Sequence, residues 1–71
     1  MMSRSYLVVI EQGERNFSAY VPDLPGCIVT ARTREQTVER MREAIALHLD
    51  GLRADGDPIP EPVTSAELIA A

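Results

Sequence analysis

The spacing of apolar residues changes once along this chain, at Thr33, and this change constrains the fold most. Before Thr33 the apolar residues form short β-branched or alternating segments bounded by Gly, Pro and Asn, a pattern typical of strands and turns. After it they recur at helical spacing, at Val38, Met41, Ile45, Leu49 and Leu52. The 71 residues are enough for one domain. We therefore expect a single α+β domain over residues 1–71, with one long helix packed on a small sheet.

Three segments before the helix have the composition of strands, at residues 6–10, 17–21 and 27–31. The first is apolar on both faces, whereas the second alternates apolar and polar residues, which is typical of a half-buried strand. Residues 12–16 supply turn-forming Gly and Asn between the first two segments. Because both connections are too short for a crossover, we expect a three-stranded antiparallel sheet.

The connection between the second and third segments is a run of Pro-Asp-Leu-Pro-Gly. Pro25 and Gly26 fit the central positions of a type II turn, in which Gly takes a positive φ. Pro22 ends the preceding strand, and Asp23 is expected to brace the turn through its own side chain. We interpret Pro22, Asp23, Pro25 and Gly26 as a structural turn motif.

The helix is predicted to run from Arg34 to Ala54. Thr33 is the candidate N-cap, and Gln36, three residues later, fits a capping box. Gly56 suits the left-handed position that follows a helix. Such a helix is about 30 Å long, whereas a five-residue strand spans only about 17 Å. The helix therefore overhangs the sheet, and the overhang needs cover from the C-terminal tail or from another chain.

Residues 59–71 form a Pro-rich tail that favours an extended backbone. Within the tail, residues 63–65 allow a short fourth strand at the edge of the sheet. For residues 66–71 two alternatives stay open, a fragment of helix or a frayed end.

The chain is acidic, because it contains 7 Arg and no Lys but 11 Asp and Glu residues, which gives a net charge of −4. A chain with this balance and no basic run is a poor partner for a phosphate backbone, and we expect no direct binding to nucleic acid. The acidity suits a basic protein partner, or serves only to keep a small domain soluble. No apolar run approaches the roughly 20 residues of a membrane span, and no signal peptide is recognisable, so we expect a cytoplasmic protein without membrane contact.

No constellation of residues suited to catalysis is visible in the sequence. His48 and Cys27 are the single His and Cys, and packing explains both, since His48 borders the apolar helix stripe and Cys27 follows a tight turn. The two cannot fill a metal site without carboxylates from unrelated places. We expect no catalytic residue, no cofactor and no metal, and a small enzyme that uses Cys27 or Asp23 stands only as a third hypothesis.

Two features indicate contact with another chain. Leu47 falls opposite the apolar helix stripe, beside Arg40 and Glu43, and marks either an ordinary exposed leucine or a second contact face. We treat Leu47, Arg40 and Glu43 as candidate protein-contact residues. The first strand is also apolar on its second face, which a monomer would expose, so we expect a homo-oligomer, either a dimer or a tetramer.

Residues 20–27, Tyr-Val-Pro-Asp-Leu-Pro-Gly-Cys, and residues 55–62, Asp-Gly-Asp-Pro-Ile-Pro-Glu-Pro, bracket the predicted helix. Together with the apolar first strand and the hairpin, they resemble the HicB-like antitoxin family over residues 5–63. The resemblance implies a partial ribonuclease-H-like fold with three strands, one long helix and sometimes a short fourth strand. Too few residues follow Val63 for the C-terminal DNA-binding domain of longer family members, so we interpret the chain as a minimal member.

The resemblance also implies a function. Members of the family neutralise a small, basic toxin of the HicA type, which cleaves mRNA, by binding it and occluding its active site. We therefore expect an antitoxin-like protein-binding module with a HicA-type toxin as its partner and no enzymatic activity. The alternative is an orphan structural or regulatory homo-oligomer without a toxin.

Overall fold

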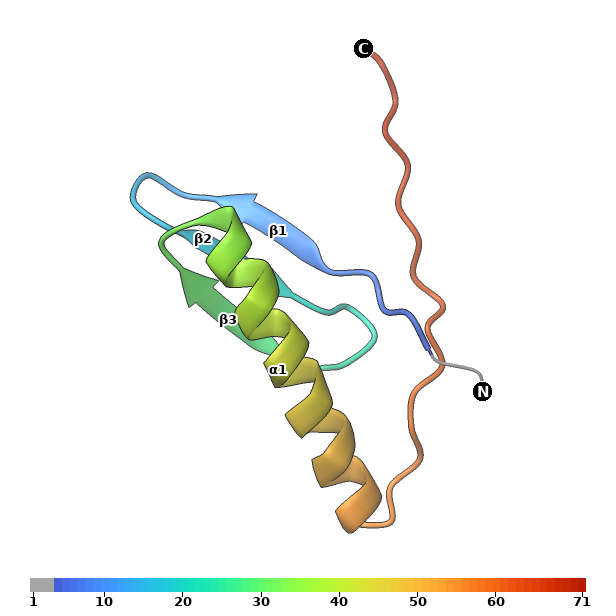
Figure 1. The fold of residues 1–71 in the computed structure, drawn as a ribbon. Coiled ribbons are helices and arrows are strands. Elements are labelled where there is room, and N and C mark those ends of the chain that lie inside the picture. The colour runs from blue at the N-terminus through green and yellow to red at the C-terminus, as the bar shows by residue number, and fades with distance from the viewer. Residues whose placement is uncertain (1–3) are drawn as a thin grey trace.

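The computed structural model describes residues 4–71, in which three strands are followed by one helix. The elements are β1 (Val9–Gln12), β2 (Phe17–Tyr20), β3 (Ile28–Ala31) and α1 (Arg34–Ala54). The strands form an antiparallel sheet in the order β1-β2-β3, and α1 lies across one face of it (Figure 1). The predicted α+β architecture, a three-stranded antiparallel sheet packed on one long helix, is confirmed.

β1 lies further along the chain than the predicted strand at residues 6–10, and that prediction was wrong in its bounds. Val9 pairs with Tyr20, the last residue of β2. Residues before Val9 have no partner in β2, because the chain turns away at Pro22, whose backbone lacks the N–H that pairing needs. The first apolar segment therefore enters the sheet only with its second half.

Two consecutive turns connect β2 to β3. The N–H of Leu24 donates to the carbonyl of Val21 at 3.0 Å, and the N–H of Cys27 donates to the carbonyl of Leu24 at 3.1 Å. Gly26, at the second central position of the second turn, has a φ of 87°, as the type II prediction requires. The two turns direct Leu24 inward, where its side chain is fully buried. The turn motif thus places an anchor in the core.

The helix begins with the predicted N-cap. The Thr33 hydroxyl accepts a hydrogen bond from the N–H of Gln36 at 3.1 Å, which satisfies one of the free N–H groups of the first turn. Thr37, one turn into the helix, is fully buried, and its hydroxyl donates to the carbonyl of Thr33 at 2.7 Å. A polar residue is therefore accepted in the core without an unpaired group.

The helix ends at Ala54, as predicted, and Gly56 takes the expected left-handed position after it, with a φ of 74°. The N–H of Gly56 donates to the carbonyl of Arg53 at 3.1 Å, and the N–H of Asp57 donates to the carbonyl of Leu52 at 2.8 Å. This pair of bonds is the Schellman arrangement, which satisfies the last carbonyls of a helix. The reversal sends the chain back along the side of α1 (Figure 1).

The core lies between α1 and the strands. Its largest fully buried apolar side chains are Leu24 and Met41. α1 packs against β2 and β3, which leaves a groove of about 290 Å³ between α1 and the segment that leads into β1. The buried apolar members of the core are Ala19, Val21, Leu24, Cys27 and Met41, with Ala31 also buried nearby.

The C-terminal half of α1 extends beyond the sheet, as the length of the helix predicts, and the tail runs back beside it (Figure 1). Residues 59–71 are extended and contain neither strand nor helix. The fourth strand that the sequence allows at residues 63–65 does not form. The tail passes close to the N-terminal segment and then continues away from the body of the protein (Figure 1).

Candidate protein-contact surface

The solvent side of α1 carries acidic residues and one large apolar residue. Leu47 is 72 % exposed, and Glu43 lies one turn before it on the same side. Glu39 and Asp50 flank the pair along the helix, each ion-paired to an arginine on the same helix. We call Glu39, Glu43, Leu47 and Asp50 the outer helix surface. It combines an apolar contact point with carboxylates on both sides.

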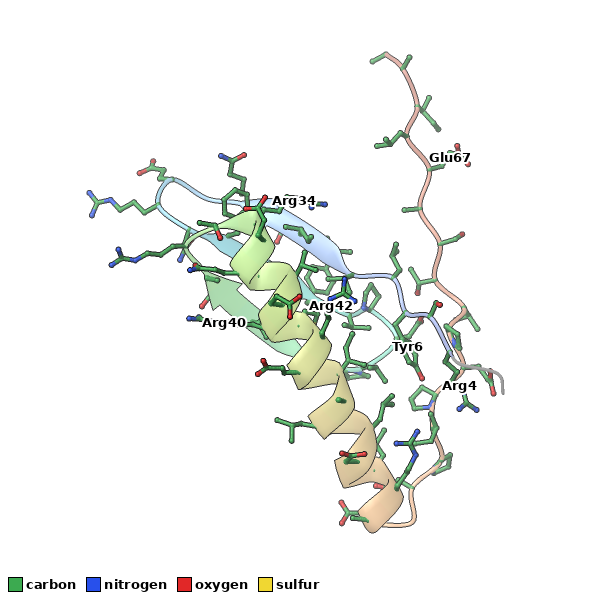
Figure 2. All side chains as sticks on the ribbon, in the orientation of Figure 1. Arg4, Tyr6, Arg34, Arg40, Arg42 and Glu67 are labelled. Carbon is green, nitrogen blue, oxygen red and sulfur yellow. The ribbon has the colours of Figure 1, made fainter. Side chains whose placement is uncertain are left out.

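Arg40 lies apart from the other two candidate contact residues. Its Nη1 donates to the carbonyl of Thr30 in β3 at 2.7 Å, so its guanidinium lies over the free edge of the sheet (Figure 2). β3 is an edge strand whose outward carbonyls have no neighbouring strand, and this bond satisfies one of them. The structure therefore brings Leu47 and Glu43 together and directs Arg40 elsewhere.

The sheet face opposite α1 carries a row of apolar side chains. The register places Val9 opposite Tyr20 and Tyr20 opposite Ile28, so one residue from each strand contributes to the row. Tyr20 is 40 % exposed and Ile28 is 67 % exposed, whereas Ala19 on the other face of β2 is buried. We call Val9, Tyr20 and Ile28 the outer sheet row.

Asp23 holds the tail, a role that the sequence did not indicate. Its Oδ2 accepts hydrogen bonds from the N–H groups of Val63 at 3.1 Å and Thr64 at 3.0 Å, and its Oδ1 accepts one from the Thr64 hydroxyl at 2.7 Å. The backbone and hydroxyl bonds from Thr64, helped by the Val63 bond and opposed by desolvation, lower the pKa of Asp23 below its ordinary value. The expectation that the Asp23 side chain stabilises its own turn was wrong, because both of its carboxylate oxygens accept hydrogen bonds from the tail instead.

Two further contacts attach the tail to the N-terminal segment. The Tyr6 hydroxyl donates to the carbonyl of Pro60 at 2.6 Å, and Arg4 forms an ion pair with Glu61 at 3.2 Å (Figure 2). Both residues of the ion pair are well exposed, so it contributes little to stability. The tyrosine bond is partly buried and fixes where the tail crosses the first segment.

The single thiol and the single imidazole occupy packing positions. Cys27 is buried, its Sγ lies 3.7 Å from Sδ of Met41, and burial raises the pKa of the thiol. His48 is half-buried on α1. Among residues 4–71 no group of three or more His, Cys, Asp or Glu side chains is placed to hold a metal ion. No helix in this part of the chain is long and apolar enough to cross a membrane.

Three antiparallel strands followed by one long helix define the chain as a small α+β protein. Residues 6–71 match the family model described as the HicB-like antitoxin of the bacterial toxin–antitoxin system. The match covers more than half of the chain, and the chain belongs to the HicB-like antitoxin family.

Individual relatives agree with this assignment. The chain is 40 % identical over 47 residues to a UPF0150 protein of Helicobacter pylori, which covers 66 % of this chain and 65 % of that protein. It is 30 % identical over 56 residues to an uncharacterized 14.9 kDa protein of Haemophilus phage HP1, which covers 79 % of this chain and 42 % of that protein. The chain thus spans less than two thirds of the length of both relatives.

A solved structure has the same fold. The chain is similar to a chain of the HicA3 and HicB3 toxin–antitoxin complex, with a TM-score of 0.71 and 30 % sequence identity. The similarity covers 84 % of this chain and 70 % of that chain.

Proposed function

We propose that this protein is an antitoxin that binds a small, basic HicA-type toxin and blocks its access to mRNA. Membership of the HicB-like antitoxin family carries the proposal. The similarity to a chain of a HicA3 and HicB3 complex supports the type of partner. The protein acts by occupying the surface of the toxin, and it performs no reaction of its own.

The outer helix surface is the contact site that we propose. A basic toxin is attracted by its carboxylates, and such complementary charge speeds encounter and favours correct orientation. Leu47 supplies an apolar group that is already exposed and loses water on binding. Glu43, which makes no ion pair within residues 4–71, is free to accept an arginine or lysine of the toxin.

Co-expression of this chain with a small basic protein encoded beside its gene tests the proposal. The tagged chain should retain that protein through purification, and the complex should leave a reporter mRNA intact while the partner alone cleaves it. A partner that is retained but still cleaves mRNA contradicts occlusion. A folded chain that retains no partner contradicts the antitoxin role itself.

The second candidate is a structural or regulatory homo-oligomer. The observation in its favour is the outer sheet row, an apolar strip on a face that no element of residues 4–71 covers (Figure 1). A second copy related by a two-fold axis would place the same row against itself and cover both. Because this face lies opposite α1, a homodimer formed there leaves the outer helix surface open to a toxin. The two candidates are therefore compatible in one assembly.

A further inference from the structure

Four of the 7 arginines in this acidic chain gather at one end of the molecule. Arg15 lies in the β1–β2 connection, Arg32 follows β3, and Arg34 opens α1. Arg40, on the second turn of the helix, reaches the edge of β3 at the Thr30 carbonyl, and Figure 2 labels it beside β3 and Arg34 at the start of the helix. Arg15 is distant in sequence from the other three, and non-basic residues separate all four, so the sequence contains no basic run that would indicate this cluster.

These arginines differ from the rest in their partners. Arg4, Arg42 and Arg53 each form an ion pair with a carboxylate. Within residues 4–71, none of the four clustered arginines has a carboxylate within ion-pairing distance. The cluster therefore keeps positive charge unneutralised in a protein whose net charge is −4.

Three of the four arginines line an open pocket of about 460 Å³. The lining of the pocket contains no carboxylate. Besides the arginines it includes Asn16 and Gln36, whose neutral amide groups can form hydrogen bonds. Arg40 is held in place by its bond to the Thr30 carbonyl, and a guanidinium has five N–H donors, so others remain for a ligand. The complete lining is Arg15, Asn16, Thr30, Ala31, Arg32, Gln36 and Arg40.

We propose that this arginine pocket binds a compact phosphate anion, the diphosphate or triphosphate group of a nucleotide-sized ligand. Guanidinium groups bind phosphate oxygens through paired, charge-assisted hydrogen bonds, and converging arginines suit a group with several such oxygens. The volume is within the range of small-molecule sites. The lining contains no aromatic side chain on which a base would stack, so recognition acts through the phosphates.

The charge of the surroundings favours a compact anion over a polymer. Glu14 and Glu35 are sequence neighbours of the clustered arginines, lie outside the pocket lining and are exposed. An extended polyanion would be repelled by these carboxylates and by the net negative charge of the whole chain. A small anion interacts mainly with the positive charges inside the pocket. This site is separate from the outer helix surface and does not rest on the toxin-binding proposal.

Calorimetric titration of the folded chain with inorganic pyrophosphate, at low ionic strength, tests the proposal. We expect saturable binding with one pyrophosphate per chain. The double variant Arg15→Gln/Arg32→Gln should weaken it by about tenfold or more, because two charge-assisted contacts are lost. Both side chains are exposed and outside the core, so circular dichroism should show an unchanged fold.

The matched control is Arg42→Gln/Arg53→Gln, which changes the net charge by the same amount at two arginines of α1 that lie outside the pocket. It should alter pyrophosphate affinity by no more than roughly twofold, because those arginines lie in exposed ion pairs. Equal weakening by both double variants, or no saturable binding at all, overturns the site. A single-stranded RNA without terminal phosphates serves as the competing ligand. If it binds more tightly than pyrophosphate, and loses that affinity in Arg15→Gln/Arg32→Gln, the ligand is a nucleic-acid backbone and the proposal of a compact anion is overturned.

Discussion

The hydroxyl of Thr64 donates a 2.7 Å hydrogen bond to Oδ1 of Asp23, across 41 residues of sequence. The second carboxylate oxygen accepts the backbone N–H groups of Val63 and Thr64. One side chain in the β2–β3 loop thus accepts three hydrogen bonds from the tail. At this point of the tail the hydrogen bonds to Asp23 take the place of apolar packing, because Val63 is 80 % exposed.

Replacing this carboxylate should free the tail. Asp23→Ala removes the two oxygens that accept all three hydrogen bonds, so the amides of Val63 and Thr64 should exchange with solvent several-fold faster while the core amides of β2 stay protected. Hydrogen exchange followed by NMR measures both. The control is Asp57→Ala, which removes the same charge from a side chain that holds nothing in the tail. Unchanged protection at residues 63 and 64 in Asp23→Ala would show that other contacts hold the tail.

Tail docking should also depend on pH. The folded-state pKa of Asp23 lies below its ordinary value of 3.8, chiefly because of the two bonds from Thr64. The contribution of these bonds is therefore complete above that value and is lost as the pH falls through the lower folded-state pKa. The Thr64 amide resonance should follow this acidic titration in wild-type protein and not in Asp23→Asn. A Thr64 midpoint at or above 3.8 would contradict the assignment.

Leu47→Ala should weaken binding of the toxin without unfolding the chain. The side chain is exposed, so its truncation costs little stability, whereas the apolar group at the centre of the proposed contact is lost and the flanking carboxylates are unchanged. We expect an affinity loss of about tenfold, measured by calorimetry with the purified partner. Ile69→Ala, which truncates another exposed apolar side chain in the tail, is the control and should bind as the wild type does. Equal affinity for Leu47→Ala would place the contact elsewhere.

Ile28→Glu tests the outer sheet row. Ile28 is 67 % exposed in the single chain, so a glutamate is tolerated there by the monomer but places like charges against each other in a symmetric dimer. Light scattering after size exclusion should give the mass of a dimer or tetramer for the wild type and a lower mass for the variant. A wild type that runs as a monomer, or a variant of unchanged mass, excludes this face as the interface.

Replacing two glycines by alanine should change the free energy of unfolding in opposite directions. Gly26 has a positive φ in the turn motif with open space around it, so Gly26→Ala should lower the free energy of unfolding by about 1 kcal/mol through backbone strain. Gly51 lies within α1, also in open space, so Gly51→Ala should raise it by about 0.5–1 kcal/mol. Urea denaturation measures both. Changes of the same sign would contradict the backbone explanation.

Local features of this fold could be predicted from sequence because their causes lie within a few residues. Thr33 and Gln36 define the start of α1, and Gly26 and Gly56 occupy the positive-φ positions that their neighbours predict. The start of β1 could not be predicted in the same way. A strand extends only as far as its partner strand does. Tyr20, which pairs with Val9, is the last residue of β2, because the chain turns away at Pro22 in the following loop.

Long-range relationships account for the rest. Asp23 binds Thr64, and Arg15 lines the same pocket as Arg32 and Arg40, only after the chain has folded. Neither spacing nor composition reveals these relationships. The apolar second face of the first segment did indicate the outer sheet row, because strand alternation is a local property. The side of α1 that carries Leu47 was likewise readable from the helical period, and its exposure is confirmed.

The bonds between the tail and Asp23 have a thermodynamic consequence for any ligand of this region. Because the same carboxylate oxygens bind Val63 and Thr64, a molecule that uses Asp23 must first displace the tail and is weakened by that competition. The coupling is reciprocal. A molecule that binds the tail in its docked position therefore also stabilises the β2–β3 loop, including the buried Leu24. The direction in which the chain leaves the body after Thr64 is therefore coupled in free energy to the state of a loop 41 residues away.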